Sequence, residues 1–241
     1  MLLNESQLPV VMDRISTGSS AFDWLLDGGY ERDAITTIYG PAGSGKTNLC
    51  ILAMVQMARN FPEKKVIYID TEGSFSVERL KQIAPDVEAV LKCVAFLNPT
   101  TFEEQKKVFL RLNELVTDKV SLIIFDSVAL LYRLEIGRAS DVYNVNRELG
   151  IQIGILSQIA RKVNIPVLIT NQIYADFEDK NRTNMVGGDL LKYQSKCLIE
   201  LQKFKDRVVR KAILRKHRSL PENREIQFYI VNEGICDVKS E

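Results

Sequence analysis

The chain has 241 residues, which is enough for one large domain with a sizeable core. Hydrophobic residues make up 46% of it and charged residues 26%, the proportions of an ordinary soluble globular protein. With a net charge of +1 the chain has no overall field that attracts polyanions, so any nucleic-acid surface must come from local clustering.

The cysteines and the single histidine argue against a zinc site, because the cysteines are far apart and form no C-x-x-C pair. The four cysteines are Cys50, Cys93, Cys197 and Cys236. Isolated cysteines with apolar neighbours are typical of a reducing cytosol, where they serve as small core residues. The sequence has no long uncharged apolar run and no signal-peptide pattern at its start, so we expect a cytoplasmic protein without a membrane span.

The N-terminal part, roughly residues 1–33, predicts one short helical segment. In "STGSSAFDWLLDGGY" a serine or threonine can cap a helix whose apolar stripe is Phe22, Leu25 and Leu26, and a glycine pair ends it. We expect Trp24 to be a packing residue and not a ligand contact.

From residue 34 onward, short apolar runs alternate with longer amphipathic segments. The runs are nearly continuous and rich in β-branched and aromatic residues, which predicts buried parallel strands at 34–40, 66–70, 93–97, 122–126 and 167–172. The segments between them predict helices at 46–60, 76–84, 101–117 and about 144–164. Thr101 and Glu104 form a capping-box pattern, and Ile151, Ile155 and Ile159 are expected to face the core. This alternation indicates right-handed crossovers and a doubly wound α/β sheet.

After Lys192 the pattern changes to three apolar runs separated by turns, "CLIELQKF", "VVRKAILRKH" and "EIQFYIV". They predict an antiparallel extension of the sheet. No linker or repeat interrupts the chain, so the predicted architecture is a single α/β domain over residues 1–241. Its mostly parallel twisted sheet is flanked by helices and continued by antiparallel C-terminal strands.

The stretch "GPAGSGKT" matches the phosphate-loop pattern G-x-x-x-x-G-K-[ST] in full, with a predicted strand before it and a helix after it. Glycines let backbone N–H groups turn toward phosphate oxygens, and the helix adds its positive N-terminus. Lys46 can reach the terminal phosphates, where it binds and assists reaction, and Thr47 can offer its hydroxyl to Mg²⁺. The predicted nucleotide contacts here are Gly40, Pro41, Ala42, Gly43, Ser44, Gly45, Lys46, Thr47 and Asn48.

Three polar residues lie at predicted strand ends, where open α/β sheets bind ligands. Asp126 is predicted to hold Mg²⁺ opposite Thr47, the alternative being a cap on the next turn. Glu72 can orient a water for attack on the γ-phosphate, although a solvated loop glutamate is an equal alternative. Asp70, its rival for that role, is better explained as a structural cap. The amide of Gln172 can bind a γ-phosphate, or can simply cap its strand.

A local basic cluster lies in "KFKDRVVRKAILRKHRS". On alternating strands many of these side chains would share a face, which predicts a DNA-backbone surface without sequence preference. The alternative is a solvated strand edge protected by charge. The predicted DNA-binding residues are Lys203, Lys205, Arg207, Arg210, Arg215, Lys216, His217 and Arg218, of which "RKHR" is the favoured part. His217 can stack on a base or sit in the turn. Tyr174 and Phe177 can stack on bases or contact the core.

Six stretches together resemble the RecA superfamily, in its archaeal and eukaryotic recombinase branch. They are "STGSSAFDWLLDGG", "YGPAGSGKTNLC", "VIYIDTEGSFSVERL", "SLIIFDSVALLYR", "NIPVLITNQI" and "MVGGDLL", in family order over nearly the whole chain. The resemblance implies a RecA-like P-loop ATPase core with ATP and Mg²⁺ as cofactors. By the same resemblance Glu72 is the carboxylate that activates water, and Gln172 couples the γ-phosphate to a DNA-contacting loop. Arg79 lies near the adenine, and a segment with Pro221 caps ATP on a neighbouring subunit.

The sequence also departs from the full recombinases of this branch. These carry an N-terminal helical DNA-binding domain and an aromatic-x-x-Ala linker motif that docks on the next subunit. We expect neither here, because the chain begins almost at the ATPase core and nothing like the motif precedes Ser16. The first DNA-loop region keeps Gly137 and Arg138, but the second carries acidic residues that would repel phosphates, Asp176, Glu178 and Asp179. The pattern most resembles the core-only recombinase paralogues of archaea.

This resemblance implies an accessory role in homologous recombination and DNA repair, with weak Mg²⁺-dependent hydrolysis of ATP to ADP and phosphate. The implied partners are single-stranded DNA, a RadA-type recombinase, other repair proteins and further copies of the chain. An active strand-exchange recombinase is the main alternative. A KaiC-like ATPase regulator that does not act on DNA fits the basic cluster less well, and a generic phosphotransferase would need a second substrate motif.

Overall fold

The computed structural model describes residues 14–175, 183–204 and 207–238. In chain order the elements are β1 (Arg14–Ile15), α1 (Ser20–Leu25), β2 (Tyr30–Glu31), β3 (Ile35–Gly40), α2 (Lys46–Asn60), β4 (Lys65–Asp70), α3 (Val77–Ile83), α4 (Val87–Lys92), β5 (Val94–Leu97), α5 (Phe102–Leu115), β6 (Val120–Asp126), α6 (Ala129–Ile136), α7 (Val142–Val163), β7 (Val167–Ala175), β8 (Thr183–Met185), α8 (Gly188–Gln194), β9 (Cys197–Lys203), β10 (Arg210–His217), β11 (Glu225–Val231) and β12 (Gly234–Asp237). None of the described helices is long and apolar enough to cross a bilayer.

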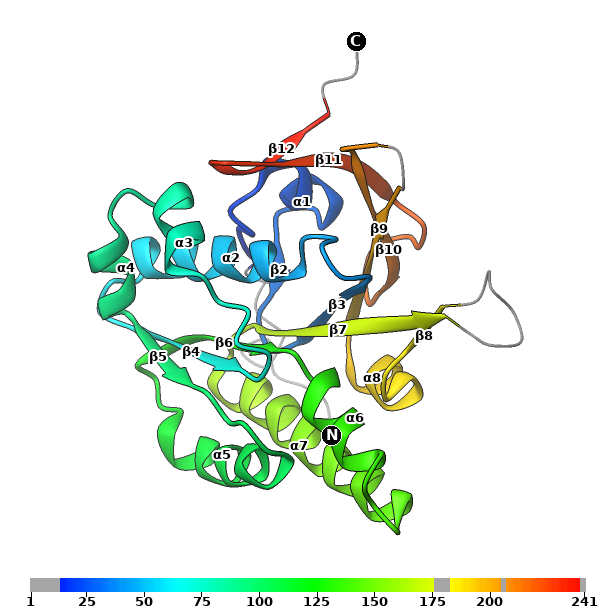
Figure 1. The fold of residues 1–241 in the computed structure, drawn as a ribbon. Coiled ribbons are helices and arrows are strands. Elements are labelled where there is room, and N and C mark those ends of the chain that lie inside the picture. Colours follow the sequence, from blue (N-terminus) through cyan, green and yellow to red (C-terminus); the bar gives the residue numbers. More distant parts are fainter. Residues whose placement is uncertain (1–13, 176–182, 205–206, 239–241) are drawn as a thin grey trace, which may run out of the picture.

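The main sheet has ten strands in the order β12-β11-β10-β9-β3-β7-β6-β4-β5, with β8 paired to β7 (Figure 1). From β9 to β5 along this path the neighbouring strands run parallel, whereas the pairs β9–β10, β10–β11 and β11–β12 are antiparallel. The phosphate-loop strand β3 lies between β9 and β7, in the middle of the sheet. This arrangement confirms the predicted fold class, a parallel α/β sheet with an antiparallel C-terminal extension.

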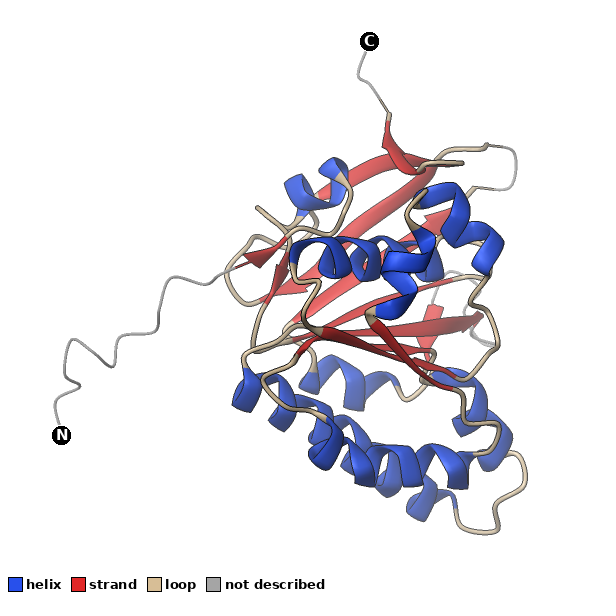
Figure 2. Ribbon diagram, turned by 90° about the vertical axis from the view of Figure 1, so that its left-hand side faces the viewer, coloured by secondary structure: helices blue, strands red, loops and turns tan. Residues whose placement is uncertain are grey.

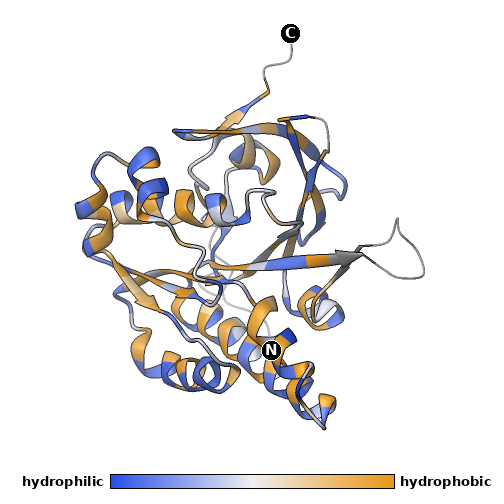
Figure 3. Cartoon of the chain, viewed as in Figure 1, coloured by the Kyte–Doolittle hydropathy of each residue, from blue (hydrophilic) through white to orange (hydrophobic). Residues whose placement is uncertain are grey.

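Helices cover the sheet on both sides (Figure 2). One hydrophobic core lies under α1, α2 and the helices after β4, and includes Phe22, Met54 and Phe228. The second lies under α5, α6 and α7 and includes Phe109 and Phe125. Most residues of the central strands are apolar, and the outward faces of the helices are hydrophilic (Figure 3). Burial on both faces is why these strands appear in the sequence as nearly continuous apolar runs.

The predicted strands and helices are confirmed, with a few differences in detail. Helices α4, α6 and α8 were not predicted, because each has eight residues or fewer and lies beside longer elements. At the start of α5, Thr101 caps the N–H of Glu104 as expected, but the Glu104 carboxylate binds Thr100, one residue earlier than a capping box requires. In α7 the core face is set by Leu149, Ile153 and Leu156, so Ile151 is exposed and that part of the prediction is wrong.

The N-terminal helix α1 buries its predicted apolar stripe, and its end depends on glycine. Gly29 has φ +120°, and a Cβ there would lie 2.0 Å from the carbonyl oxygen of Ile15. Trp24 differs from the prediction, because its side chain is 61% exposed. Its ring lies 4.8 Å from the Arg224 guanidinium, which also donates to the Trp24 carbonyl. Among the cysteines, Cys236 is exposed and the other three are buried.

Candidate nucleotide site

The phosphate loop joins β3 to α2 and uses left-handed backbone at Gly43 (φ +72°) and Gly45 (φ +111°). These conformations turn the backbone N–H groups toward one centre, and L side chains adopt them at a cost. The Lys46 ammonium donates to the carbonyls of Gly40 (2.9 Å) and Pro41 (3.0 Å). Burial lowers the pKa of Lys46, while Glu72 and Asp126 oppose this shift. The buried Ser44 hydroxyl has no hydrogen-bond partner among the described residues, which leaves it free for a ligand in the loop.

Asp126 ends β6 beside this loop and is 2% exposed. Its carboxylate accepts hydrogen bonds from four hydroxyl groups, those of Thr47 (2.8 Å), Tyr68 (3.0 Å), Ser74 (3.2 Å) and Thr170. The pKa of Tyr68 is raised mainly by burial and further by the nearby Asp126, so the phenol stays a proton donor. A carboxylate with hydroxyl oxygens around it is a donor set of the type that Mg²⁺ prefers. Thr47 and Asp126, the predicted metal ligands, are thus brought into direct contact.

Glu72 lies just beyond β4 and points toward the ends of the neighbouring strands. The Gln172 amide donates to both Glu72 carboxylate oxygens, at 3.1 and 3.0 Å, and the Ser127 hydroxyl donates to one of them. Asp70 caps the same turn by accepting from the N–H groups of Glu72, Ser74 and Phe75, as predicted. The turn therefore holds Glu72 over the carboxyl edge of the sheet, beside the phosphate loop.

Arg79, on α3, is fixed against both the loop helix and the C-terminal hairpin. Its Nε donates to Asn48 on α2 at 2.6 Å. Its terminal nitrogens donate to the carbonyls of Val231 (2.8 Å), Asn232 (3.0 Å) and Gly234 (3.2 Å). Arg79 and Asn48, both predicted nucleotide contacts, are therefore joined to the turn between β11 and β12.

Several residues around Asp126 and Glu72 were not predicted from the sequence: Tyr68, Ser74, Ser127 and Thr170. Tyr68 and Thr170 lie inside buried strands, and only the strand register brings them to Asp126. The sequence signal that could have found Tyr68 and Thr170 is a hydroxyl group within an apolar run, because a buried hydroxyl needs a hydrogen-bond partner.

The basic cluster does not form one surface. His217 and Arg218 lie at the C-terminal end of β10, beside the buried Glu31. The N–H groups of Ser219 and Leu220 donate to the His217 ring. His217 thus sits in the turn, the second of its two predicted positions, and its side chain is only 1% exposed. Arg218 also pairs with Asp33 at 2.6 Å.

The other cationic side chains of β10 divide between the two faces of the sheet. Arg215 pairs with Glu200 at 2.6 Å, and Lys216 donates to the Lys192 carbonyl. The register places Arg210 opposite Lys203, and a bulge lies between Leu214 and Lys216. The expectation that these side chains share a face is therefore wrong, because alternation and the bulge separate them. Arg207 is exposed, and Lys205 lies outside the described residues.

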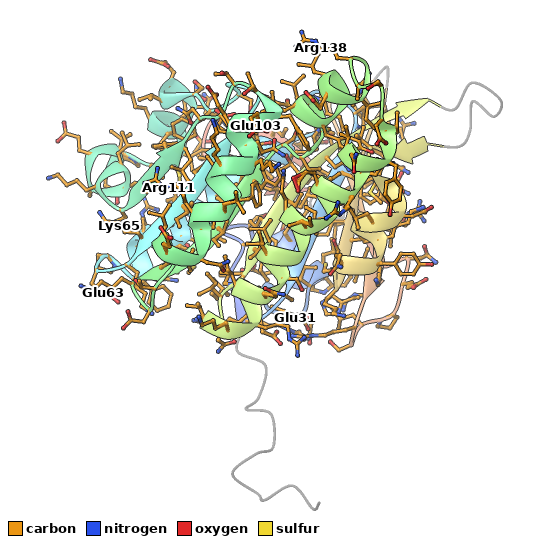
Figure 4. The ribbon with its side chains drawn as sticks, turned by 90° about the horizontal axis from the view of Figure 1, so that it is seen from below. Glu31, Glu63, Lys65, Glu103, Arg111 and Arg138 are labelled. Atoms are coloured by element: carbon orange, nitrogen blue, oxygen red, sulfur yellow. The ribbon has the colours of Figure 1, made fainter. Side chains whose placement is uncertain are left out.

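The described parts of both predicted DNA-loop regions lie at the carboxyl edge of the sheet. Figure 4 places Arg138, just after α6, and Glu31 at opposite edges of the face that α5 and α7 cover. The β7–β8 hairpin projects from the edge near Arg138. Phe177 and the three acidic residues of the second loop lie outside the described residues, as does the side chain of Tyr174.

The Pro221 segment, between β10 and β11, lies at the end of β10 away from the chain's own phosphate loop. Arg210 at the start of β10 contacts Gly43, and the strand then runs about 25 Å at the usual rise per residue. In this structure Pro221 is exposed and does not reach the nucleotide site of its own chain.

The loop between β3 and α2, the buried carboxylate of β6 and the Glu72–Gln172 pair define a P-loop nucleotide-binding domain of the RecA type. The Rad51 family model matches residues 10–238. The DNA repair and recombination protein RadB of Methanobrevibacter smithii is 40% identical over 223 residues, covering 90% of this chain and 93% of that protein. The RadB protein of Methanoculleus marisnigri is 44% identical over 230 residues, covering 94% and 99%.

A solved structure, described as the crystal structure of the RadB recombinase, superposes with a TM-score of 0.79 at 35% identity. It covers 93% of this chain and all of that one (100%). The chain therefore belongs to the Rad51 family, and the relatives it matches here are archaeal RadB proteins. The predicted resemblance to an archaeal recombinase paralogue is confirmed.

Proposed function

We propose that this chain is an ATP- and DNA-binding accessory protein of homologous recombination and DNA repair, which modulates a recombinase and hydrolyses ATP slowly. In this proposal residues 1–241 act as one ATPase domain. The observation that carries it is the convergence of Lys46, Thr47, Asp126 and the Glu72–Gln172 pair at one edge of the sheet. The names of the RadB relatives, DNA repair and recombination proteins, support the biological setting.

The contacts of the site and the family resemblance support the following roles. The loop N–H groups and Lys46 bind the phosphates, and Thr47 and Asp126 hold Mg²⁺, which supplies charge neutralisation when bound. Arg79 and Asn48 form the base side of the site. Glu72 orients the attacking water, and Gln172 reports the state of the γ-phosphate to the β7–β8 hairpin on whose strand it lies.

Slow turnover is supported by the contacts of Glu72. Its carboxylate already accepts from Ser127 and twice from Gln172, so it must exchange at least one of these bonds before it can orient a water. Each exchange costs free energy, because these groups are partly buried.

DNA binding is proposed for Arg207, which is exposed and follows the end of β9, and, on the sequence pattern alone, for Lys205, which lies outside the described residues. The acidic residues of the second loop argue against tight DNA contact by that loop. We therefore propose weak binding to single-stranded DNA without sequence preference. The exposed Pro221 segment supports self-association in which it covers the nucleotide of a neighbouring copy.

A second candidate is an active DNA-dependent recombinase that catalyses strand exchange. The observation in its favour is the same Glu72–Gln172 contact, because it joins the proposed catalytic carboxylate to the strand that leads into the second loop.

Phosphate release measured with and without single-stranded DNA, with light scattering in parallel, tests the two candidates. The accessory function predicts ATP binding, slow turnover and little change on adding DNA. Its effect on a recombinase is measured by adding the chain to a strand-exchange reaction of a RadA-type protein. Rapid DNA-stimulated hydrolysis together with filament growth would contradict the accessory function and favour the second candidate.

A further inference from the structure

Two basic residues of the cluster differ from the others in where the sheet puts them. Lys203 ends β9 and Arg210 begins β10, and the register places them directly opposite each other. Leu201 and Ala212, the next pair on the same face, are completely buried in the core under α2. Lys203 and Arg210 therefore extend that inner face, toward the start of α2, and do not lie on the outer face with Lys211.

Both side chains reach the phosphate loop. The Arg210 Nε donates to the Gly43 carbonyl at 3.1 Å. A Cβ on Gly43 would lie 3.6 Å from the Lys203 ammonium, so the missing side chain at this position leaves room for the cation. The two residues thus flank the loop from outside while Lys46 lies within it.

Among the described residues, no acidic side chain balances the charges of this pair. Like charges directly opposite each other on neighbouring strands are destabilising. No carboxylate in the described ranges pairs with Lys203 or Arg210, whereas Lys211 pairs with Glu225 at 2.9 Å. Burial lowers the pKa of Arg210, and no acidic neighbour opposes that shift. Two cations on neighbouring strands, both against a phosphate loop and with no counter-charge in the part of the chain that the structure describes, form an arrangement that an anion would stabilise.

We propose that Lys203 and Arg210 belong to the nucleotide site and not to the DNA surface. Arg210 is a positioning residue that fixes the Gly43 carbonyl outward, so that the following N–H groups face the phosphates. Lys203 supplies positive charge to the terminal phosphates of a nucleoside triphosphate. This inference rests on the proposed function, since it assigns further residues to the same nucleotide site.

The test compares Lys203→Gln and Arg210→Gln with the control Lys211→Gln, which removes the same charge from the other face of β10. ATP and ADP affinities are measured by calorimetry, and thermal unfolding is followed with and without nucleotide. We expect the first two variants to lose ATP affinity about tenfold, the size of one charge-assisted hydrogen bond, and ADP affinity less. Lys211→Gln leaves both affinities unchanged.

In the absence of nucleotide, Lys203→Gln is expected not to destabilise the protein, although it weakens ATP binding. Lys203→Gln removes one of the two like charges that the register places opposite each other, so its unfolding temperature without nucleotide is expected to be equal to or above that of the wild type, while the upward shift caused by ATP shrinks. If Arg210→Gln does not fold, Arg210→Lys replaces it in the test. This variant keeps the charge and is expected to recover part of the ATP affinity.

Three outcomes distinguish a role in the nucleotide site from a role in DNA binding and from failure of the proposed function. Unchanged ATP affinity in both Gln variants overturns the inference while the wild-type protein still binds ATP. Loss of DNA affinity with normal ATP affinity also overturns it and returns the two residues to the DNA surface. Failure of the wild-type protein to bind ATP contradicts the proposed function itself.

Discussion

The Gln172 amide donates to both oxygens of the Glu72 carboxylate, at 3.1 and 3.0 Å, although the two residues lie 100 positions apart. The contact joins the turn after β4 to the strand β7, whose far end begins the second predicted loop. Any group that displaces the amide from Glu72 therefore changes both the proposed catalytic carboxylate and the hairpin beyond Gln172.

Replacing Glu72 by Gln should separate binding from turnover. The amide keeps the size of the side chain but cannot accept a proton from water, so we expect at least about a tenfold loss of phosphate release with ATP affinity within about twofold. Steady-state release and calorimetry measure the two quantities. The exposed Glu78, on α3, gives the matched control Glu78→Gln, which should behave as the wild type. Equal turnover in both variants would remove Glu72 from the reaction.

Lys46→Ala should abolish nucleotide binding and keep the fold. The ammonium is largely buried and donates to Gly40 and Pro41, both within the loop, so its loss removes the positive charge at the phosphates. We expect ATP affinity to fall by about a hundredfold or more, judged from the strength of charge-assisted hydrogen bonds. Circular dichroism checks the fold. Retained ATP affinity would refute the assigned role of the loop.

Asp126→Asn should weaken the Mg²⁺ dependence of ATP binding. The amide carries no charge and turns two donor hydrogens toward a site where four hydroxyl groups now donate. We expect the Mg²⁺ concentration needed for half-maximal ATP binding to rise about tenfold or more. Titration of Mg²⁺ against a fluorescent ATP analogue measures it. An unchanged midpoint would favour the alternative role of Asp126 as a turn cap.

DNA binding should depend on Arg207 and Lys205, the basic residues between β9 and β10 in the sequence. We expect Lys205→Ala with Arg207→Ala to weaken binding to single-stranded DNA and to reduce its salt slope by about one to two. Fluorescence anisotropy at several salt concentrations measures this. Arg218→Ala is the contrasting variant, because Arg218 pairs with Glu31 and Asp33; it should lower the free energy of unfolding by roughly 3 kcal/mol. If Arg218→Ala weakens DNA binding while the Lys205/Arg207 double variant does not, the DNA-binding surface lies at the edge of the sheet near Arg218 and Glu31.

The single histidine should make stability depend on pH. Burial lowers the pKa of His217, and Arg14, Arg218 and Arg224 add to this, while Glu31 opposes it. Near neutral pH and below, the folded protein then binds fewer protons at His217 than the unfolded chain, so the stability contributed by the neutral imidazole is fully present above about pH 6.5 and is progressively lost as the pH falls below that value. Urea unfolding between pH 7 and 5.5 measures the loss. His217→Gln should remove this slope, and an equal slope in the variant would assign it to carboxylates.

Much of the fold was predictable because the central strands are buried on both faces. Continuous apolar runs at β3, β4, β6 and β7, separated by amphipathic helices, leave few alternatives to a parallel sheet. The short helices and the exposed face of Trp24 were not predictable in this way. A helix of two turns has too few residues for a clear period, and a surface tryptophan held by Arg224 depends on a residue far away in the chain.

The candidate site was predictable where a residue of suitable chemistry lies in a recognisable loop or at the end of a predicted strand. The glycine pattern and the acidic strand ends locate Lys46, Thr47 and Asp126 without a structure. The basic cluster was misjudged because the sequence contains the charges but not their partners. Whether Arg215 binds a phosphate or Glu200 depends on the pairing of β9 with β10, and a bulge after Leu214 shifts that pairing.

The hydrogen bond from Thr47 to Asp126 also decides what the threonine oxygen can offer. Its only hydroxyl proton is committed to the carboxylate, so the lone pairs of that oxygen are directed away from Asp126. An oxygen held in this way is a Lewis base for a hard cation and a poor donor toward a phosphate oxygen. The same bond polarises the O–H group, so the protein's own contacts set the hydroxyl rotor of Thr47 in an orientation suited to a metal.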